Sequence, residues 1–533
     1  MRKYITFIAI LWSLSLVTSC SDSFLDEEVQ DAYSASNVTD KLSLNAALIG
    51  LYQQISNYYT YSGEQGWLCV WQVGTDITWP TQPQGAEIPF YRYNTLTSDN
   101  GVALRIWSLD YNIIENSNNV IYAIDVNGDQ ISDMTEAEKL QFSAEAKFFR
   151  ARAYNEMATL FGGVPLVTEP IKEPRTDFVR ASLQEINALI ESDLLFAISN
   201  LPAIGQTVEE QRVSSAAASQ LLAKVYLRMG DYAQAEAQCD ILIDNPSIAL
   251  VSNRYGVKAG EEGDAFSDMF LVGNQRRSQG NSEAIWVLEN ENPSDVRGGS
   301  SGSPQQRRVW GGAYHNRNGM IPADSLGGRG LSRMRLNNWV LYDLYDNSDM
   351  RNSKYSIHRR FKYNNPNTPD LYGQDVPYEG PDTLFIINPY TLKWGQFDPR
   401  DVFGYGMWKD FILMRLGETY LLKAEAQFMQ GDLEGAAASI NALRTRANAP
   451  LVDASDIDMD FILDERVREL LGEENRRLEL MRTGTLLDRV YLNDDAPENM
   501  KIEGISEKNL LFPIPITEIQ LNKDAELEQN PGY

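Results

Sequence analysis

The chain has 533 residues, of which 74 are acidic and 47 are Lys or Arg, and its net charge is −27. This charge argues against a nucleic-acid partner, because phosphate binding needs a surface rich in Lys and Arg. It also disfavours acidic ligands in general and attachment to anionic lipid by charge alone. A chain of this length can bury a large core, and its three cysteines are too few for a disulfide-stapled scaffold.

The N-terminus predicts a secretory signal peptide over residues 1–19. Two basic residues precede the apolar run Ile5–Val17, which is shorter than the ~20 residues that cross a bilayer as a helix. The run leads into an LVTSC motif ending at Cys20, which resembles the lipobox of bacterial lipoproteins. We therefore expect lipidation of Cys20 and a polar leash over residues 20–40. The alternative is an ordinary signal peptide with an incidental cysteine.

Helical periodicity then predicts helices over residues 104–124, 144–160 and 181–200. The next segment, 212–244, has the spacing of a tetratricopeptide hairpin. Its small residues would let two antiparallel helices approach closely, and its Gly-Asp pair would make the turn and begin the second helix. A second segment with this pattern covers residues 424–444. Two matching hairpins and the flanking helices predict an α-helical repeat scaffold.

Between the hairpins, residues 251–409 are rich in Gly, Ser, Asn, Pro and aromatic residues, with few helical patterns. Residues 283–289 predict one short strand. Long loops on a rigid helical frame commonly carry binding functions, so aromatic residues in these loops, and in the similar stretch after the first helix, are candidates for ligand contact.

The sequence favours a non-enzymatic protein without a cofactor. Gly298–Gly302 fits the G-x-S-x-G pattern of a nucleophile elbow, but neither a strand before it nor a helix after it is predicted. His315 and His358 are the only histidines, which disfavours a histidine-rich metal site, and no metal is predicted. Near the C-terminus, residues 464–483 alternate Arg and Glu, which predicts structural salt bridges along one helix face.

Several segments together resemble the SusD/RagB family of bacterial outer-membrane nutrient-binding lipoproteins. They occur in family order over nearly the whole chain: Cys20 followed by FLD, AEAKFFRARAYNEMATLFGGVPLV, RLGETYLLKAEAQFMQGD, INALRTRAN, ERVRELLGEENRRLELMRTG and the terminal LFPIPITEIQLNKDAELEQNPGY. The resemblance implies a mostly α fold, a tetratricopeptide-like hairpin scaffold with a loop-rich, irregular central region and few short strands. We expect a helical repeat-like part over 41–250, a loop-rich aromatic region over 251–409 and a helical part over 410–533, together forming one compact body.

The resemblance also implies a function. A member of this family would be lipid-anchored in the cell outer membrane, facing the exterior, and would capture a glycan and deliver it to a SusC-like TonB-dependent β-barrel transporter as the lid of that barrel. Two alternatives stay open: peptide cargo within the same architecture, and a surface glycoside hydrolase.

Ligand sites in this family are aromatic arcs with polar neighbours, built from loops of the N-terminal third and the central region. An exposed ring stacks on the apolar face of a sugar, while polar side chains bind its hydroxyl groups. Trp107 and Trp286 stand at core spacings and are set aside. The predicted ligand-binding residues are Asp76, Trp79, Tyr91, Arg92, Trp310, Tyr314, Asn316 and Arg317.

Overall fold

The computed structural model describes residues 38–60, 64–296, 304–378, 382–492 and 495–533. The signal peptide, Cys20, nearly all of the leash and the Gly298–Gly302 motif lie outside these described residues. Within them, no helix combines the length and the apolar character needed to cross a membrane.

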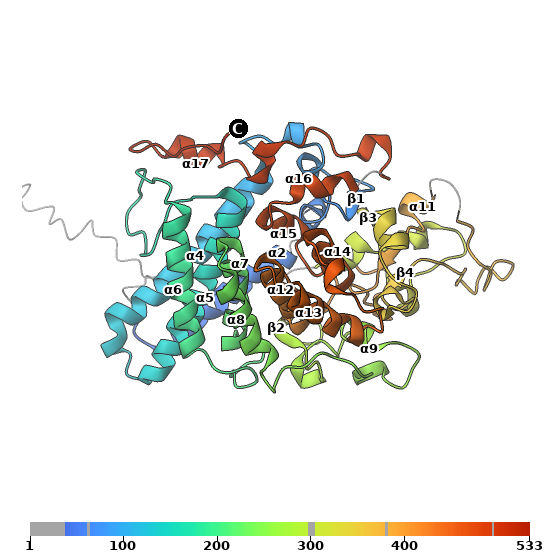
Figure 1. Cartoon of the computed structure of the whole chain (residues 1–533), viewed down its shortest axis with the longest axis horizontal. Coiled ribbons are helices and arrows are strands. Elements are labelled where there is room, and N and C mark those ends of the chain that lie inside the picture. The colour runs from blue at the N-terminus through green and yellow to red at the C-terminus, as the bar shows by residue number, and fades with distance from the viewer. Residues whose placement is uncertain (1–37, 61–63, 297–303, 379–381, 493–494) are drawn as a thin grey trace, which may run out of the picture.

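The N-terminal part is a stack of long helices at one end of the molecule (Figure 1). The helices that pack successively, α4 on α5 and α5 on α6, confirm the three helices predicted before the first hairpin. Both α5 and α6 begin with a capping box, in which Thr135 and Ser182 exchange hydrogen bonds with Glu138 and Glu185. The helices are α2 (Lys41–Thr60), α4 (Gly101–Asn127), α5 (Glu136–Phe161) and α6 (Leu183–Asn200).

Both predicted hairpins are confirmed, and they turn in the same way. Gly230 and Gly431 end the first helix of each hairpin with φ of 81° and 82°, a conformation that favours glycine. The following residues, Asp231 and Asp432, accept a hydrogen bond from a backbone N–H in the first turn of the second helix. The two hairpins pack against each other through α8 and α12. Their helices are α7 (Ser215–Met229), α8 (Tyr232–Ile243), α12 (Leu416–Met429) and α13 (Leu433–Arg446).

The strands are short and form three separate antiparallel pairs. Each pair joins segments that are distant in the sequence, so the strands tie loops to one another. The predicted strand at 283–289 is confirmed as β2. The pairs are β1 (Thr78–Pro80) with β3 (Met334–Leu336), β2 (Ala284–Leu288) with β6 (Phe411–Arg415), and β4 (Ile357–His358) with β5 (Tyr390–Thr391).

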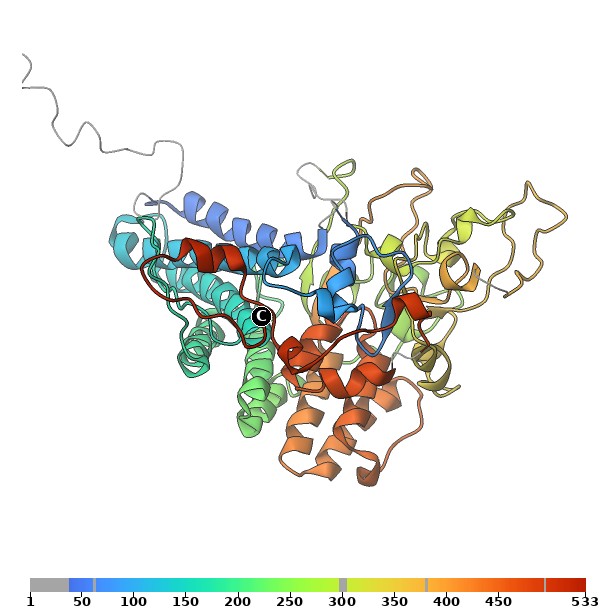
Figure 2. The same ribbon diagram turned by 90° about the horizontal axis from the view of Figure 1, so that it is seen from above.

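Most of the C-terminal helices lie between the N-terminal helices and the loops of the central region, but the last of them lies over the N-terminal helices (Figures 1 and 2). The single helix predicted over 464–483 is instead two helices, because the chain turns at Gly472, where φ is 81°. The two are α14 (Met459–Leu470) and α15 (Arg476–Arg482). They are followed by α16 (Leu486–Arg489) and α17 (Ile516–Leu521). Four short helices lie in loops: α3 (Gly66–Cys69), α9 (Ala265–Asp268), α10 (Gln306–Trp310) and α11 (Asp382–Phe385).

One large hydrophobic cluster joins the N-terminal helices, the central region and the C-terminal helices. It contains Leu48 of α2, Trp286 of β2 and Leu480 of α15. Trp107 and Trp286 are buried in it, as their spacing predicted. Because α10 and β3 also contribute side chains to this cluster, the loops of the central region rest on a packed base.

Candidate ligand-binding surface

The first group of predicted ligand residues lies in the interface between the N-terminal loop and the C-terminal helices. Trp79 of β1 is only 1% exposed, and the guanidinium of Arg335 in β3 lies 5.5 Å from its ring centre. The Asp76 carboxylate is buried and accepts hydrogen bonds from Arg476 and Arg489, at 2.6–3.0 Å. Burial alone would raise the pKa of Asp76, but the two guanidiniums outweigh it and lower the pKa. In this structure both residues hold the fold together.

Tyr91 and Arg92 follow in the same loop. The Tyr91 ring is buried, and Arg92 lies 5.6 Å from its centre while donating to the carbonyl of Asn499 at 3.0 Å. The backbone of this loop pairs with Glu503, which fixes it against the C-terminal segment. Neither side chain meets the other predicted residues of the central region in a described contact, and their contact with a ligand stays a prediction.

The second group lies in the central region. Trp310 ends α10 and Tyr314 follows it, and both rings are buried; the Tyr314 hydroxyl donates to the carbonyl of Gly328 at 2.6 Å. Asn316 is exposed, and Arg317 donates to the Tyr363 hydroxyl at 3.2 Å. The structure offers no ring face of Trp310 or Tyr314 to solvent for stacking, and ligand contact by these four residues also stays a prediction.

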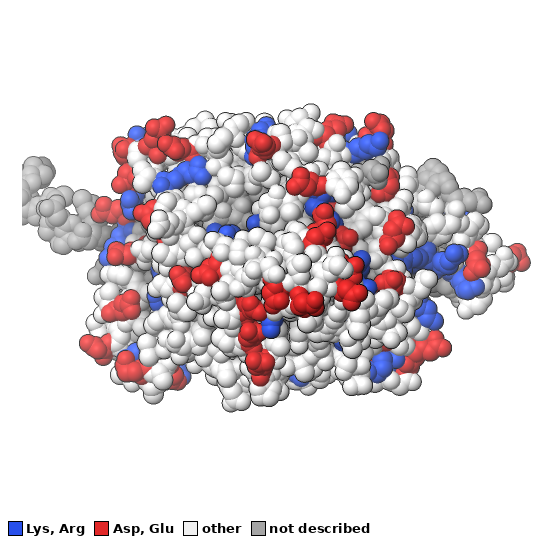
Figure 3. Space-filling view, in the orientation of Figure 1, with Lys and Arg blue, Asp and Glu red and all other residues white. Residues whose placement is uncertain are grey.

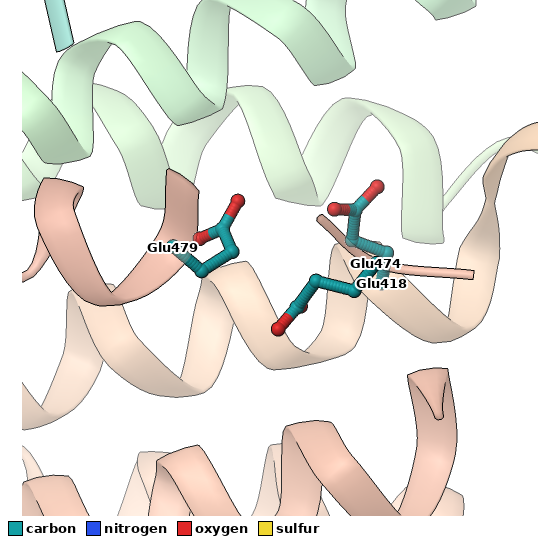
Figure 4. Close-up of side chains that lie close together, drawn as sticks. All are labelled: Glu418, Glu474 and Glu479. Atoms are coloured by element: carbon teal, nitrogen blue, oxygen red, sulfur yellow. The ribbon is translucent and has the colours of Figure 1, made fainter. Parts of the chain in front are cut away.

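Trp310 instead lines a partly open cavity of about 210 Å³ between the three parts of the chain. Its wall includes several aromatic rings together with Glu474 and Glu479. An oxygen of each of these two carboxylates and one of Glu418 lie within 4.8 Å of one another. Figure 4 shows the three side chains. Arg466 supplies the positive charge that such a cluster needs, at 2.6 Å from Glu474 and 3.3 Å from Glu479. Lys224 also pairs with Glu418, and Arg482 pairs with Glu479 at 2.9 Å, so three cations of the protein face the three carboxylates.

A larger groove of about 860 Å³ lies in the central region, between α9 and the loops around β4. Figure 3 shows basic side chains gathered at the end of the molecule where these loops lie. Several of the groove's cations have a carboxylate partner within the groove itself. They pair as Arg254 with Asp268 at 2.5 Å, Lys258 with Asp324 at 2.5 Å, and Lys354 with Glu262 at 3.2 Å. Three of the groove's cations are thus compensated, whereas Arg359 and Arg360 in its lining form no ion pair among the described residues.

Exposed rings with polar neighbours occur at a third place, on the loop that leads to β6. Phe403 is 54% exposed and Tyr405 is 61% exposed. The guanidinium of Arg308 lies 4.3 Å from the centre of the Tyr405 ring, and that of Arg329 lies 5.2 Å from the same centre. Arg329 also donates to the backbone carbonyl of Phe403 at 2.6 Å, which holds the loop in place. With 61% of the residue exposed, Tyr405 keeps accessible ring surface that can stack on a ligand.

Amide side chains extend this surface toward the N-terminal loop. Arg333 donates to the Gln65 Oε1 atom at 2.5 Å and to Gln82 at 3.1 Å. Gln65 donates to the Oε1 atom of Gln305, which also accepts from Arg308 at 2.6 Å. A continuous chain of contacts therefore runs from the N-terminal loop to the exposed rings. We call this surface the arginine arc: Gln65, Gln82, Gln305, Arg308, His315, Arg329, Arg333, Phe403 and Tyr405.

Close backbone packing positions the arc. The segment 331–333 runs beside α10 and donates to the carbonyls of Arg308, Val309 and Gly311 at 2.7–2.9 Å. A side chain at Gly330 would meet the Gly311 carbonyl oxygen at 2.1 Å, so glycine is required for this approach. This packing holds Arg329 and Arg333 close to Arg308, which belongs to α10.

The charges of the arc act on one another. Burial and the neighbouring charge of Arg329 lower the pKa of Arg308 to about 10. Burial and the two guanidiniums of Arg329 and Arg308 lower the pKa of His315 to about 4, so its imidazole is neutral near pH 7. Among the described residues, no carboxylate forms an ion pair with Arg308, Arg329 or Arg333. The arc therefore presents positive charge beside exposed rings.

The sequence prediction did not include any residue of the arc. Its two groups of candidates are interspersed with the arc in the sequence, and Gln65 and Gln82 come from the same N-terminal loop as the first group. Two signals in the sequence could have indicated it: the pair Arg307-Arg308, and the run FGYG at 403–406, in which glycines separate two rings.

Comparison with known proteins agrees with this architecture. The model described as "SusD family" matches residues 274–533, and the model described as "Starch-binding associating with outer membrane" matches residues 23–227. The chain belongs to the SusD/RagB family. Among its SusD-like relatives, SusD-like protein P25 of Formosa agariphila is 26% identical over 95% of both chains. The starch-binding protein SusD of Bacteroides thetaiotaomicron is 25% identical over 76% of this chain and 75% of its own.

Solved structures show the same SusD-like fold. A laminarin-binding SusD-like protein superposes with a TM-score of 0.68 over 93% of this chain and all of its own, at 23% identity. The surface glycan-binding protein A of Bacteroides thetaiotaomicron, solved in complex with laminarihexaose, superposes with a TM-score of 0.70 at 17% identity, over 92% of this chain and all of its own. The prediction of a mostly helical SusD-like fold is confirmed.

Proposed function

We propose that this protein is a non-enzymatic, cell-surface glycan-binding lipoprotein that delivers its ligand to a SusC-like TonB-dependent transporter. The observation that supports glycan binding most directly is the pair of exposed rings, Phe403 and Tyr405, beside hydrogen-bonding arginine and amide side chains. This combination suits a sugar, whose ring has an apolar face and a rim of hydroxyl groups. The glycan-binding relatives named above support the same class of ligand.

The supporting body is rigid where the ligand would bind. The arc lies on α10 and beside β3, both of which contribute to the large hydrophobic cluster. A preformed surface loses little conformational freedom on binding, so even a shallow platform can hold a polysaccharide. The acidic cluster in the cavity is compensated by Lys224, Arg466 and Arg482, and we assign it a structural role rather than glycoside hydrolysis.

Glycan binding can be tested by affinity gel electrophoresis of the full chain in non-ionic detergent. Retardation by one polysaccharide, reduced in Tyr405→Ala and in Phe403→Ala, is the expected result. Trp79→Ala and Trp310→Ala test the residues predicted from the sequence. If no polysaccharide retards the chain, the result would contradict the proposal and favour peptide cargo instead. Release of reducing sugar during incubation would instead establish a hydrolase.

Anchoring and delivery need separate experiments. The family description refers to association with the outer membrane, and we propose that Cys20 provides the attachment. In membrane fractionation, Cys20→Ala is expected to move the protein out of the outer-membrane fraction. We further propose that the folded body closes over the barrel of its transporter. Cross-linking in intact cells should join the two proteins, and loss of the transporter should abolish uptake of the glycan without abolishing its binding.

A further inference from the structure

The arc contains three neighbouring arginines that lack acidic partners. Arg308, Arg329 and Arg333 donate to amide oxygens, a backbone carbonyl and a histidine nitrogen, all of which are neutral acceptors. A neutral acceptor completes a hydrogen bond but carries no negative charge, so the positive charge of each guanidinium stays uncompensated. Since like charges repel, three such guanidiniums in one place are unfavourable unless an anion joins them.

Each of the three also retains donors that the described residues do not use. Arg308 is only 6% exposed, yet its buried Nε atom has no acceptor. Arg329 donates through Nε and Nη1, and so does Arg333, so the Nη2 group of each has no acceptor among the described residues. Buried donors are nearly always paired in folded proteins, so the Arg308 Nε atom indicates a binding partner that is absent from the isolated chain. Arg329 and Arg333 are half-buried, and their Nη2 groups remain accessible to such a partner.

Two other arginines show that an arginine without a carboxylate partner is not necessarily available to a ligand. Arg477 is fully buried and donates to the carbonyls of Val70, Val73 and Phe90 and to the hydroxyl of Tyr93. Arg307, beside the arc, likewise donates to backbone carbonyls through all its nitrogens. These guanidiniums are fully engaged and structural. The arc differs because each of its three arginines keeps a donor that no described residue uses, and because exposed rings lie beside it.

The nearest acidic groups do not compensate the arc. Asp398 and Asp401 interact electrostatically with Arg307, which lies outside the arc, and Asp398 is already paired with Arg400 at 2.7 Å. Glu87 acts on Arg333 but forms no ion pair with it. The overall net charge of −27 predicts that acidic ligands are disfavoured, but at this surface the local charge is positive. Local charge decides short-range binding, because salt screens more distant charges within about 8–10 Å.

We infer that the glycan bound at the arginine arc carries acidic groups, either carboxylates or sulfate esters. This inference rests on the proposed function and specifies its ligand class. Arg308, Arg329 and Arg333 would bind the acidic substituents through charge-assisted hydrogen bonds, for which the planar guanidinium is well suited. Tyr405 and Phe403 would stack on the sugar ring that carries the substituent.

The inference can be tested with pairs of polysaccharides that differ in charge alone. Polygalacturonate and its methyl ester test the carboxylate, and dextran sulfate and dextran test the sulfate. Binding to the full chain in detergent would be measured by affinity gel electrophoresis at 50 mM and 500 mM NaCl. We expect the charged member of one pair to bind at least tenfold more tightly than its uncharged partner, with the difference shrinking at high salt.

Variants locate the effect. Arg329→Gln and Arg333→Gln should each weaken binding of the charged probe by about tenfold, the scale of one charge-assisted hydrogen bond. Arg360→Gln is the matched control, because Arg360 is an exposed arginine of the same region that lies outside the arc, and it should bind normally. Circular dichroism would verify that each variant is folded.

The outcomes separate the two hypotheses. Equal binding of a charged probe and its uncharged partner, or charged binding that the arc variants leave unchanged, would overturn the inference while glycan binding stands. Binding of a neutral glycan alone, lost in Tyr405→Ala, would do the same. If neither these probes nor any neutral polysaccharide binds, the proposed function fails together with the inference.

Discussion

Arginines in two regions of this molecule have opposite surroundings. Around α14 to α16, Arg466, Arg476 and Arg489 are buried and each contacts at least one carboxylate within 3.0 Å. In the central region, Arg308 and Arg329 contact a tyrosine ring and neutral acceptors, without a carboxylate partner among the described residues. The first arrangement stabilises a fold, while the second leaves charge and donors available. The contrast shows which arginines of an acidic protein are candidates for ligand binding.

The largest effect should come from breaking the paired region. Asp76→Ala leaves Arg476 and Arg489 buried without their shared carboxylate, and removal of one partner from such a cluster costs about 3–5 kcal/mol. The free energy of unfolding in urea should fall by that amount. Asp324→Ala is the control, because its ion pair with Lys258 is exposed and contributes at most about 1 kcal/mol.

The stabilisation by the Asp76 ion pairs should also depend on pH. Because the folded state lowers the pKa of Asp76 below its ordinary value of 3.8, the stabilisation is present above that value and is lost as the pH falls through the lower, folded pKa. The difference in stability between the wild type and Asp76→Ala should therefore be constant near pH 7 and shrink in strong acid. A difference that grows toward low pH would contradict the assigned ion pairs.

For the arginines of the arc we expect the reverse: a small effect on stability and a larger effect on ligand binding. Arg329→Gln removes a charge that no described carboxylate compensates, so the free energy of unfolding should change by less than about 1 kcal/mol. Binding of an acidic glycan should nevertheless weaken about tenfold. Urea denaturation and affinity electrophoresis of the same preparation measure both quantities. Severe destabilisation by Arg329→Gln would place this arginine with the structural group instead.

The aromatic ring should have a smaller effect on binding than the charges. Tyr405→Ala removes the exposed ring and should weaken glycan binding by about 0.5–1.5 kcal/mol, the range typical of a ring contact. Tyr405→Phe keeps the ring and should bind nearly as the wild type does. Equal losses in both variants would mean that the hydroxyl group, rather than stacking, carries the contact.

The smallest effect is expected from pH in the binding assay. The pKa of His315 is about 4 and that of Arg308 about 10, so neither group changes charge between pH 5 and 8. Affinity for an acidic glycan should stay constant over this interval. A loss of affinity as the pH rises through about 6.5 would show that a protonated histidine, not the arginines, binds the ligand.

The sequence determined the helical scaffold of this protein. Both hairpins follow from a local pattern, in which small residues allow close packing and Gly-Asp makes the turn, and such patterns need no knowledge of distant segments. The strand β2 was likewise visible as a short apolar run. The exposure of the aromatic residues was harder to predict, because a tryptophan in a loop has the same local sequence signal whether its ring is exposed or buried.

The tertiary structure alone decided the roles of the charged and aromatic side chains. Residues 464–483 predict salt bridges along a helix face, and two such pairs exist, Arg468 with Glu465 and Arg482 with Glu479. However, Asp76 lies about 400 positions before Arg476, and only folding brings them together. Arg308 and Tyr405 likewise come from separate loops. Long-range contacts determine which charges are compensated, so the sequence shows the groups available and the fold determines which of them remain free for a ligand.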